Sequence, residues 1–118
     1  MKYIFLLALV LPFNSFACLS TNNLEIEIDG KIIPSVYKTE ELVAHYKSIE
    51  LIESQCFAPD NELSDKEVYI KTIQLSVPQE IKIEVGSTYL LTGIAFHAHT
   101  AHHYTDIVFS VMSAKKLN

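Results

Sequence analysis

The chain has 118 residues and a formal net charge of -5 at pH 7, with 49% hydrophobic and 19% charged residues. This length accommodates one small domain and excludes a two-domain enzyme. The positive residues are nine lysines, without any arginine, and they are outnumbered by acidic residues. A protein that grips the phosphate backbone of nucleic acid needs the opposite balance, so we expect no nucleic-acid partner.

The first seventeen residues have the composition of a secretory signal peptide. Lys2 supplies a positive start, residues 3–13 form a short apolar stretch, and Ser15 and Ala17 place small residues at a cleavage site. The stretch is too short to span a bilayer as a helix, and no later apolar run is long enough either. We therefore expect a leader at 1–17, a single exported domain at 18–118 in the periplasm or outside the cell, and no transmembrane helix.

The two cysteines, Cys18 and Cys56, leave two alternatives open. Cys18 directly follows the expected cleavage site, where a bacterial lipoprotein would carry its lipid, but Ser15 stands where such signals usually have Leu. The alternative is a Cys18–Cys56 disulfide, because an even cysteine count in a small exported domain normally forms a disulfide framework. The two exclude each other, since a lipidated Cys18 leaves Cys56 unpaired. The sequence context favours the disulfide.

Most of the mature chain has the pattern of β-strands. Residues 24–29 alternate strictly between apolar and acidic side chains, as in a strand with one face on a core. Further segments rich in β-branched and aromatic residues predict strands at 48–54, 67–77, 79–85, 88–98 and 104–112. Residues 39–47 are ambiguous: Thr39 is able to cap a short helix there, which we predict, but the segment also suits an approach to the next strand. We predict an all-β fold with minor α content, a small barrel of five or six strands.

Four of the five histidines fall within seven consecutive positions, which suggests a metal site. On a strand, His97 and His99 would point to the same face about 6 to 7 Å apart, close enough for two imidazoles to reach one ion. His102 or His103 would supply a third ligand from across the turn, and Asp106 a carboxylate. Imidazole suits several ions, so Zn, Cu and Ni all remain candidates, and we expect no other cofactor.

A structural role for the same histidines is the alternative that we favour. The side chains expected to hold the rings in a fixed polar network are Thr100, Tyr104 and Thr105. Strand alternation also disperses the rings: with Phe96 facing the core, His97 and His99 point outward, whereas His103 points inward. Only an irregular turn would bring the four rings together.

The sequence predicts no catalytic machinery. His97, His99 and His102 have the spacing of the His-x-His-x-Asp-His motif of metallo-β-lactamase-like hydrolases, but Ala101 stands in the place of the Asp. Those enzymes also need a much longer chain. No serine lies in a nucleophile-elbow or Ser-x-x-Lys context, and the cysteines are expected to be oxidised. We therefore do not expect an enzyme.

Residues 91–108, which read LTGIAFHAHTAHHYTDIV, resemble the C-terminal signature of a bacterial family of exported domains of unknown function, family 4431. That signature is a glycine-containing strand, then Phe-x-Ala-x-Thr-x-His-His and a Thr before a hydrophobic strand. The segment 73–75 and Cys56 resemble blocks further upstream. The resemblance implies a small OB-like barrel that is exported and has no established activity.

Two functions of different classes follow. The first is a non-catalytic exported binding module that recognises a protein, peptide or envelope polymer, with the acidic surface favouring a basic or neutral ligand. The alternative is a periplasmic protein that binds a divalent metal through the histidine-rich hairpin. The sequence leaves the oligomeric state undetermined.

Overall fold

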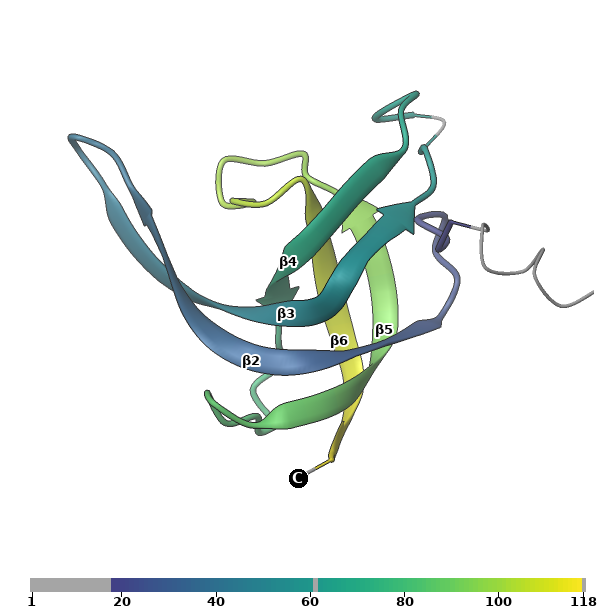
Figure 1. Cartoon of the computed structure of the whole chain (residues 1–118). Coiled ribbons are helices and arrows are strands. Elements are labelled where there is room, and N and C mark those ends of the chain that lie inside the picture. Colours follow the sequence, from purple (N-terminus) through teal and green to yellow (C-terminus); the bar gives the residue numbers. More distant parts are fainter. Residues whose placement is uncertain (1–17, 61, 118) are drawn as a thin grey trace, which may run out of the picture.

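The computed structural model describes residues 18–60 and 62–117, and its regular elements are five strands (Figure 1). These are β2 (Ile26–Lys38), β3 (Val43–Phe57), β4 (Val68–Ser76), β5 (Thr88–His97) and β6 (Ile107–Lys116). The all-β prediction is confirmed, and the described residues contain no helix. No helix in this part of the chain is therefore long and apolar enough to cross a membrane. The expected leader at 1–17 lies outside the described residues.

The five strands form a closed barrel in the order β2-β3-β4-β6-β5, with β5 pairing back onto β2. Four of the five contacts between neighbours are antiparallel, and the β4–β6 contact is parallel. Closure leaves the barrel without the two long free edges that an open sheet would expose. The prediction of a small barrel is thus confirmed, with five strands.

The β2–β3 hairpin is longer than the barrel wall needs. Its ladder runs from the Gly30–Leu51 pair to the Lys38–Val43 pair, whereas β3 pairs with β4 only from Ser48 onward. The outer part, residues 34–47, is therefore a two-stranded arm that projects from the barrel (Figure 1). We refer to it as the arm.

The predicted helix at 39–47 is wrong, because these residues form the tip and the returning strand of the arm. The hydroxyl of Thr39 accepts hydrogen bonds from the backbone N–H groups of Glu41 and Leu42, at 3.3 and 3.1 Å. A threonine that would cap a helix thus closes a tight turn instead. From Val43 on, the backbone pairs with β2, which satisfies the groups that a helix would have bonded internally.

The predicted strand at 79–85 is also wrong. The N–H of Ile81 donates to the carbonyl of Pro78 at 3.0 Å, which makes a turn, and Ile83 is buried in the core. The apolar alternation is real, but it serves to fill the end of the barrel. The segment belongs to none of the five strands of the closed barrel.

Buried side chains alternate along the strands, as expected, but on β5 the buried face is the opposite of the predicted one. Tyr89, Leu91, Ala95 and His97 are the buried side chains of this strand, so Phe96 faces away from the core and His97 toward the interior, the reverse of the prediction. The small residues face inward to make room for Phe109, the partner of Ala95 across the sheet. Gly93 shows how tight this packing is, because a Cβ there would meet the backbone oxygen of Ser110. The buried hydrophobic cluster is Ile28, Ile32, Ile49, Leu51, Phe57, Ile73, Leu75, Ile83, Tyr89, Leu91, Ala95, Ile107, Phe109 and Val111.

The start of the described chain is fastened to the end of β3. Cys18 and Cys56 form a disulfide, as predicted. Beside it, the N–H of Leu19 donates to the carbonyl of Cys56, and the N–H of Ala58 donates to the carbonyl of Leu19, each at 2.8 Å. Because both sulfurs belong to the disulfide, the alternative of a lipid on Cys18 is not compatible with this structure.

Breaking this disulfide will destabilise the barrel. The bridge joins residues 38 apart in the sequence, and closing such a loop in the unfolded chain is worth about 3 to 4 kcal/mol. We expect the free energy of unfolding in urea to fall by about this amount in the Cys18→Ser/Cys56→Ser variant. The reduced wild-type protein is the matched control and should have the same stability as the variant. A loss below about 1 kcal/mol in both would contradict the prediction.

Candidate functional site

The histidine-rich segment is the β5–β6 loop, residues 98–106, and the buried His97 sits at its start. His97 is only 4% exposed, and its Nε2 lies 2.8 Å from the carbonyl oxygen of Ala58. A carbonyl oxygen only accepts hydrogen bonds, so Nε2 carries the proton and donates it. The His97 ring therefore fastens β5 to the β3–β4 connection and does not face the other histidines.

His99 and His103 pack against each other. Their ring centroids are 4.7 Å apart in an edge arrangement, and the Phe96 ring lies 5.2 Å from the ring of His103. The Nδ1 atom of His103 accepts the backbone N–H groups of His99 and Thr100, at 3.0 and 3.2 Å. The Nδ1 atom of His99 donates in turn to the carbonyl of His97 at 3.0 Å.

The pKa of His103 lies below its ordinary value of 6.5. The largest cause is partial burial, which disfavours the charged ring, and positive charge on the neighbouring His99 and His102 adds to it. The hydrogen bonds act in the same direction, because a protonated Nδ1 has no lone pair left to accept the two N–H groups. The folded loop therefore favours the neutral form of His103.

Of the predicted metal ligands, the structure places the rings of His99 and His103 side by side and turns His97 away from them. Within residues 18–60 and 62–117, the group of three metal-ligating side chains whose ligand atoms lie within 4.8 Å of one another is Cys18, Cys56 and Glu67. The candidates of the loop do not belong to it: His97, His99, His102, His103 and Asp106. The physical reason is the inward direction of His97, together with the hydrogen bonds that occupy one nitrogen each of His97, His99 and His103.

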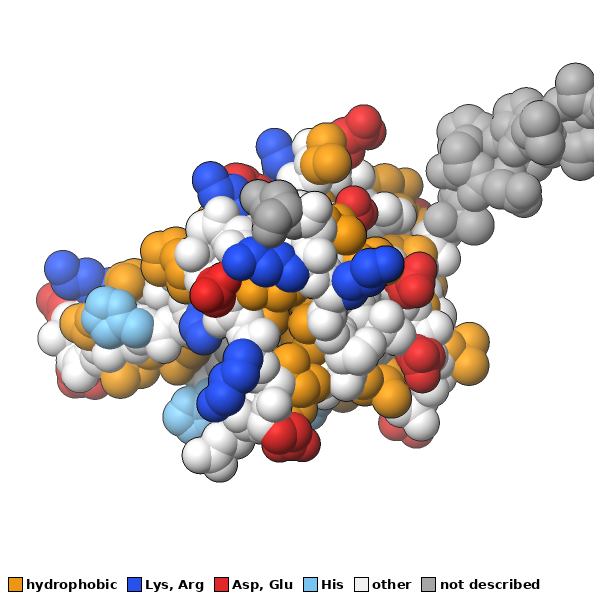
Figure 2. Space-filling model, turned by 90° about the horizontal axis from the view of Figure 1, so that it is seen from below, with side chains coloured by type: hydrophobic (Ala, Val, Ile, Leu, Met, Phe, Trp, Pro, Cys, Tyr) orange, Lys and Arg blue, Asp and Glu red, His pale blue; other side chains and the backbone are white. Residues whose placement is uncertain are grey.

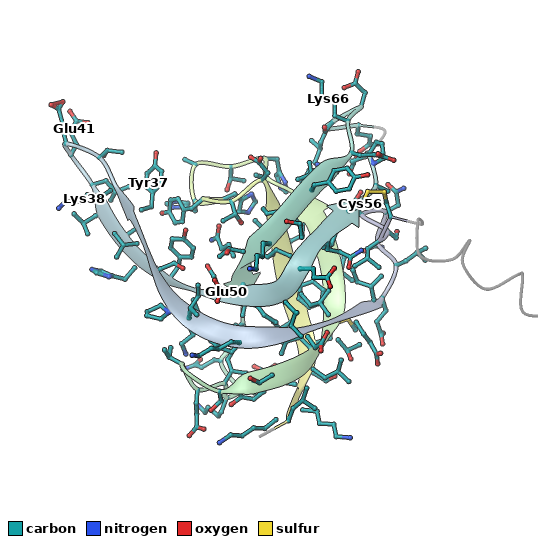
Figure 3. All side chains as sticks on the ribbon, in the orientation of Figure 1. Tyr37, Lys38, Glu41, Glu50, Cys56 and Lys66 are labelled. Carbon is teal, nitrogen blue, oxygen red and sulfur yellow. A yellow bond between two sulfur atoms is a disulfide. The ribbon has the colours of Figure 1, made fainter. Side chains whose placement is uncertain are left out.

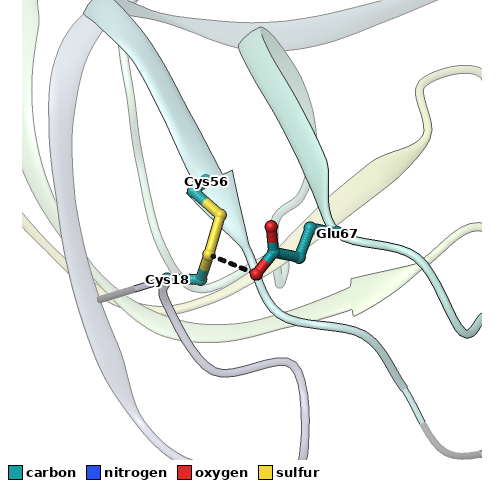
Figure 4. A group of neighbouring side chains, drawn as sticks. All are labelled: Cys18, Cys56 and Glu67. Carbon is teal, nitrogen blue, oxygen red and sulfur yellow. Dashed lines mark hydrogen bonds between the residues drawn. A yellow bond between two sulfur atoms is a disulfide. The ribbon is translucent and has the colours of Figure 1, made fainter. Parts of the chain in front are cut away.

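The cysteine group is not a metal centre either. A carboxylate oxygen of Glu67 lies 3.4 Å from the Sγ atom of Cys18 (Figure 4). Metal binding requires thiolates, but both sulfurs are bonded to each other. The contact places a negative group beside the disulfide.

Gln74 anchors the loop, and sequence reasoning missed it. Its side-chain Nε2 donates to the carbonyl of His102 at 3.0 Å, and its Oε1 accepts the N–H of Tyr104 at 2.6 Å. Its backbone N–H donates to the hydroxyl of Thr105 at 2.9 Å, and this hydroxyl donates to the carbonyl of Ile107 at 2.6 Å. The signal in the sequence was a glutamine between two core residues of an apolar strand, a position where a buried polar group needs partners.

Tyr104 joins the loop to the arm. Its ring stacks on the ring of Tyr37, with centroids 4.6 Å apart and planes inclined by 20°, and it packs at 5.1 Å on Tyr46. Tyr37 lies on the arm, as labelled in Figure 3. Through Gln74 and Tyr104, the loop is held over the outer surface of β4 and against the arm.

A groove opens on another part of the barrel, where β2 and β3 separate. These strands pair as far as Gly30 and Leu51, and then β3 bends away through a bulge between Glu50 and Gln55. Glu50 and Cys56 mark this stretch of β3 in Figure 3. The groove has a volume of about 500 Å³ and is lined by Glu27, Ile28, Asp29, Leu51, Ile52, Glu53, Ser54, Gln55, Cys56 and Tyr69. We call it the β2–β3 groove.

The walls of the β2–β3 groove combine acidic and apolar side chains. Glu27, Asp29 and Glu53 are exposed, whereas Ile28 and Leu51 belong to the buried core. At the rim, the side chains of Ile52 and Tyr69 are 77% and 70% exposed, the highest values among the exposed large hydrophobic residues of the described chain. A second hollow of about 470 Å³, beside Lys66, Glu67 and Asp106, carries charges of both signs.

Comparison with known proteins supports the resemblance seen in the sequence. The model of a family described as a domain of unknown function (DUF4431) matches residues 72–115, less than half of the chain. This part is similar to that family and spans most of β4, the next connection, β5, the histidine-rich loop and nearly all of β6. No curated protein matches the sequence.

Replacing Gln74 will loosen the loop. In the Gln74→Leu variant, the N–H of Tyr104 and the carbonyl of His102 lose their partners in a partly buried place, which should cost about 1 to 3 kcal/mol of unfolding free energy. Urea unfolding measures this, and limited proteolysis should show earlier cleavage within 98–106. Gln79→Leu, at an exposed turn, is the matched control and should change stability little. Equal effects of the two changes would contradict the assigned role.

His103 should make stability depend on pH. Because the folded state holds the pKa of His103 below 6.5, its contribution is fully present above that pH and declines as the pH falls, where the unfolded chain takes up the proton first. In the His103→Asn variant, the amide oxygen is expected to accept the same N–H groups without titrating. The drop in Tm between pH 7.5 and 5.5 should therefore be smaller in this variant than in the wild type. His45→Asn, at an exposed position on the arm, should keep the wild-type drop.

Proposed function

We propose that this chain is an exported, non-catalytic binding module that recognises a basic protein or peptide through the β2–β3 groove. The observation that carries the proposal is the lining of the groove, which includes three carboxylates and no basic side chain. A concave site of one sign attracts ligands of the opposite sign and accelerates their association. The net charge of -5 acts in the same direction.

The distribution of charge on the surface supports this choice. Figure 2 shows the molecule from below, with lysine side chains over the middle and left of the face and acidic side chains more frequent along the right. The right is the side on which β2 begins in Figure 1. The carboxylates of Glu27 and Asp29 lie near this start of β2, so a basic ligand would be attracted to that side of the molecule.

The apolar residues at the rim of the groove would add hydrophobic contacts to the attraction between charges. Exposed ion pairs contribute only about 0.2 to 1 kcal/mol each, so a purely electrostatic site would be weak. Ile52 and Tyr69 stand exposed beside the carboxylates, and aromatic and large apolar side chains are the residues on which interfaces gain affinity. Side chains of the ligand are expected to cover these two residues.

The barrel itself is, in our proposal, OB-like. Its first strand pairs with the second and the fourth, and its third pairs in parallel with the fifth, a Greek-key arrangement of five strands. In OB-folds, the loops after the first and fourth strands frame a binding face. Here the loop after the fourth strand is held against the arm by the stacking of Tyr104 on Tyr37 of the first strand, and this contact between the two regions favours the β2–β3 groove as the binding site.

Export is the other part of the proposal. The Cys18–Cys56 disulfide is the type of bond that persists in an oxidising compartment such as the periplasm or the outside of the cell. This agrees with a leader at 1–17. Metal binding by the histidines has less support, because His97 is turned toward Ala58 and one ring nitrogen each of His99 and His103 takes part in a hydrogen bond within the loop.

Removing the charges of the groove tests the function. We expect a lysine-rich peptide to bind the wild-type protein in low salt, with an affinity that falls as salt rises. The Glu27→Gln/Asp29→Asn/Glu53→Gln variant should bind it about tenfold more weakly, the sum expected of three exposed charge pairs. Isothermal titration calorimetry measures both affinities.

A matched control removes three exposed acids elsewhere. The Glu40→Gln/Glu41→Gln/Glu62→Gln variant changes the net charge by the same amount, at the tip of the arm and in the β3–β4 connection. It should bind within about threefold of the wild type. Equal weakening in both variants would mean that net charge alone attracts the peptide, and the groove would not be its site.

A further inference from the structure

We propose that the ligand of the β2–β3 groove is an extended basic segment that adds to the barrel as a strand along β2. This inference rests on the proposed function and specifies how the partner is bound. In strand addition, main-chain hydrogen bonds provide affinity and alternate side chains provide specificity. The evidence is the pairing of β2 and β3, the alternation of their side chains and the charge of the groove.

The first part of β2 has a partner on one side only. Residues 26–29 pair with β5, from the Ile26–Gly93 pair to the Asp29–Leu90 pair. The ladder with β3 begins only at Gly30. Among residues 18–60 and 62–117, no strand pairs with the side of β2 that faces the groove along residues 26–29, which is therefore an open strand edge in an otherwise closed barrel.

The opposite wall is unpaired as well. Ile52, Glu53 and Ser54 pair with neither neighbour, because the ladder with β2 ends at Leu51 and the ladder with β4 resumes only at Gln55. Backbone N–H and C=O groups of strands normally find a partner. An added strand would give partners to groups of β2 on one side, and it would lie within reach of β3 on the other.

The alternation of β2 specifies the side chains of the partner. Glu27 and Asp29 are exposed on one face, and the buried Ile28 lies between them on the other. In an added strand, residues opposite Glu27 and Asp29 would share that face and be two positions apart. We infer a segment with Lys or Arg at alternate positions and apolar residues between them.

The length of the free edge of β2 limits how many residues of the ligand can pair with it. Four residues of β2, at about 3.3 Å each, span about 13 Å. A ligand of four to six extended residues fills this length. A disordered basic tail or an edge strand of a basic protein has both the charge and the conformation required.

The acidic residues have another conceivable role, which the same experiment tests. Charged side chains often protect a strand edge from pairing with a second copy of the same protein. With this role alone, the wild type would bind no peptide, and the Glu27→Gln/Asp29→Asn/Glu53→Gln variant would self-associate. Strand addition predicts peptide binding by a monomeric wild-type protein.

Four peptides of six residues separate these outcomes. The parent alternates lysine and valine (KVKVKV, with blocked ends), and the second has the same composition in two blocks (KKKVVV). The other two are the parent with N-methyl groups on its odd or its even residues, which removes the N–H donors of one edge but keeps the charge. We expect the block peptide and at least one N-methylated peptide to bind about tenfold more weakly than the parent. Amide hydrogen exchange within residues 26–29 should slow when the parent binds.

Each contrary result has a distinct meaning. Equal binding of all four peptides, without slower exchange in β2, would overturn strand addition but leave a basic ligand in the groove. Absence of binding by all four at low salt would overturn the proposed function together with the inference. Self-association of the uncharged variant in that case would assign the acids to protection of the edge.

Discussion

Closure of the barrel through β2 is the constraint on which the rest of the structure depends. A single strand must pair with β3 on one side and β5 on the other, and at Gly30 it does both at once, opposite Leu51 and Tyr89. A Cβ at this position would meet the backbone oxygen of Glu50, so only glycine allows the three strands to approach so closely. Before Gly30, β2 pairs with β5. Gly30 and Lys31 pair with both β3 and β5, and after Lys31 the partner strand of β2 is β3, with which it continues into the arm. The β2–β3 groove lies where the pairing of β2 with β3 ends and only the pairing of β2 with β5 continues.

Two further segments pack on the barrel without joining its strands. Residues 79–85 contribute Ile83 to the buried core. The histidine-rich loop folds over the outer surface of β4, where Gln74 and Tyr104 hold it. Within it, the rings of His99 and His103 contact each other and accept or donate hydrogen bonds of the local backbone. This loop gives the chain its most unusual sequence, but the structure uses it to join the barrel to the arm.

The proposed site lies away from this loop, and its parts come from distant places in the sequence. Glu27 and Asp29 lie on the first strand, Glu53 lies in the bulge of the second, and Tyr69 lies on the third. The disulfide contributes Cys56 to the lining and fixes the start of the described chain beside the groove.

The sequence by itself determined the fold class, the disulfide and most strand positions, because the two-residue period and the cysteine count are local signals. It placed the helix and a sixth strand wrongly, since Thr39 and the apolar residues 79–85 suit two conformations. The pairing of β3 with β2 and the burial of Ile83 in the core select between them. It also reversed the faces of β5, because the bulk of Phe96 suggested a core position that the structure gives to Ala95 and Gly93, across from Phe109. The groove was beyond sequence reasoning altogether. It arises from a bulge and from the end of a ladder, and these depend on how distant strands pair.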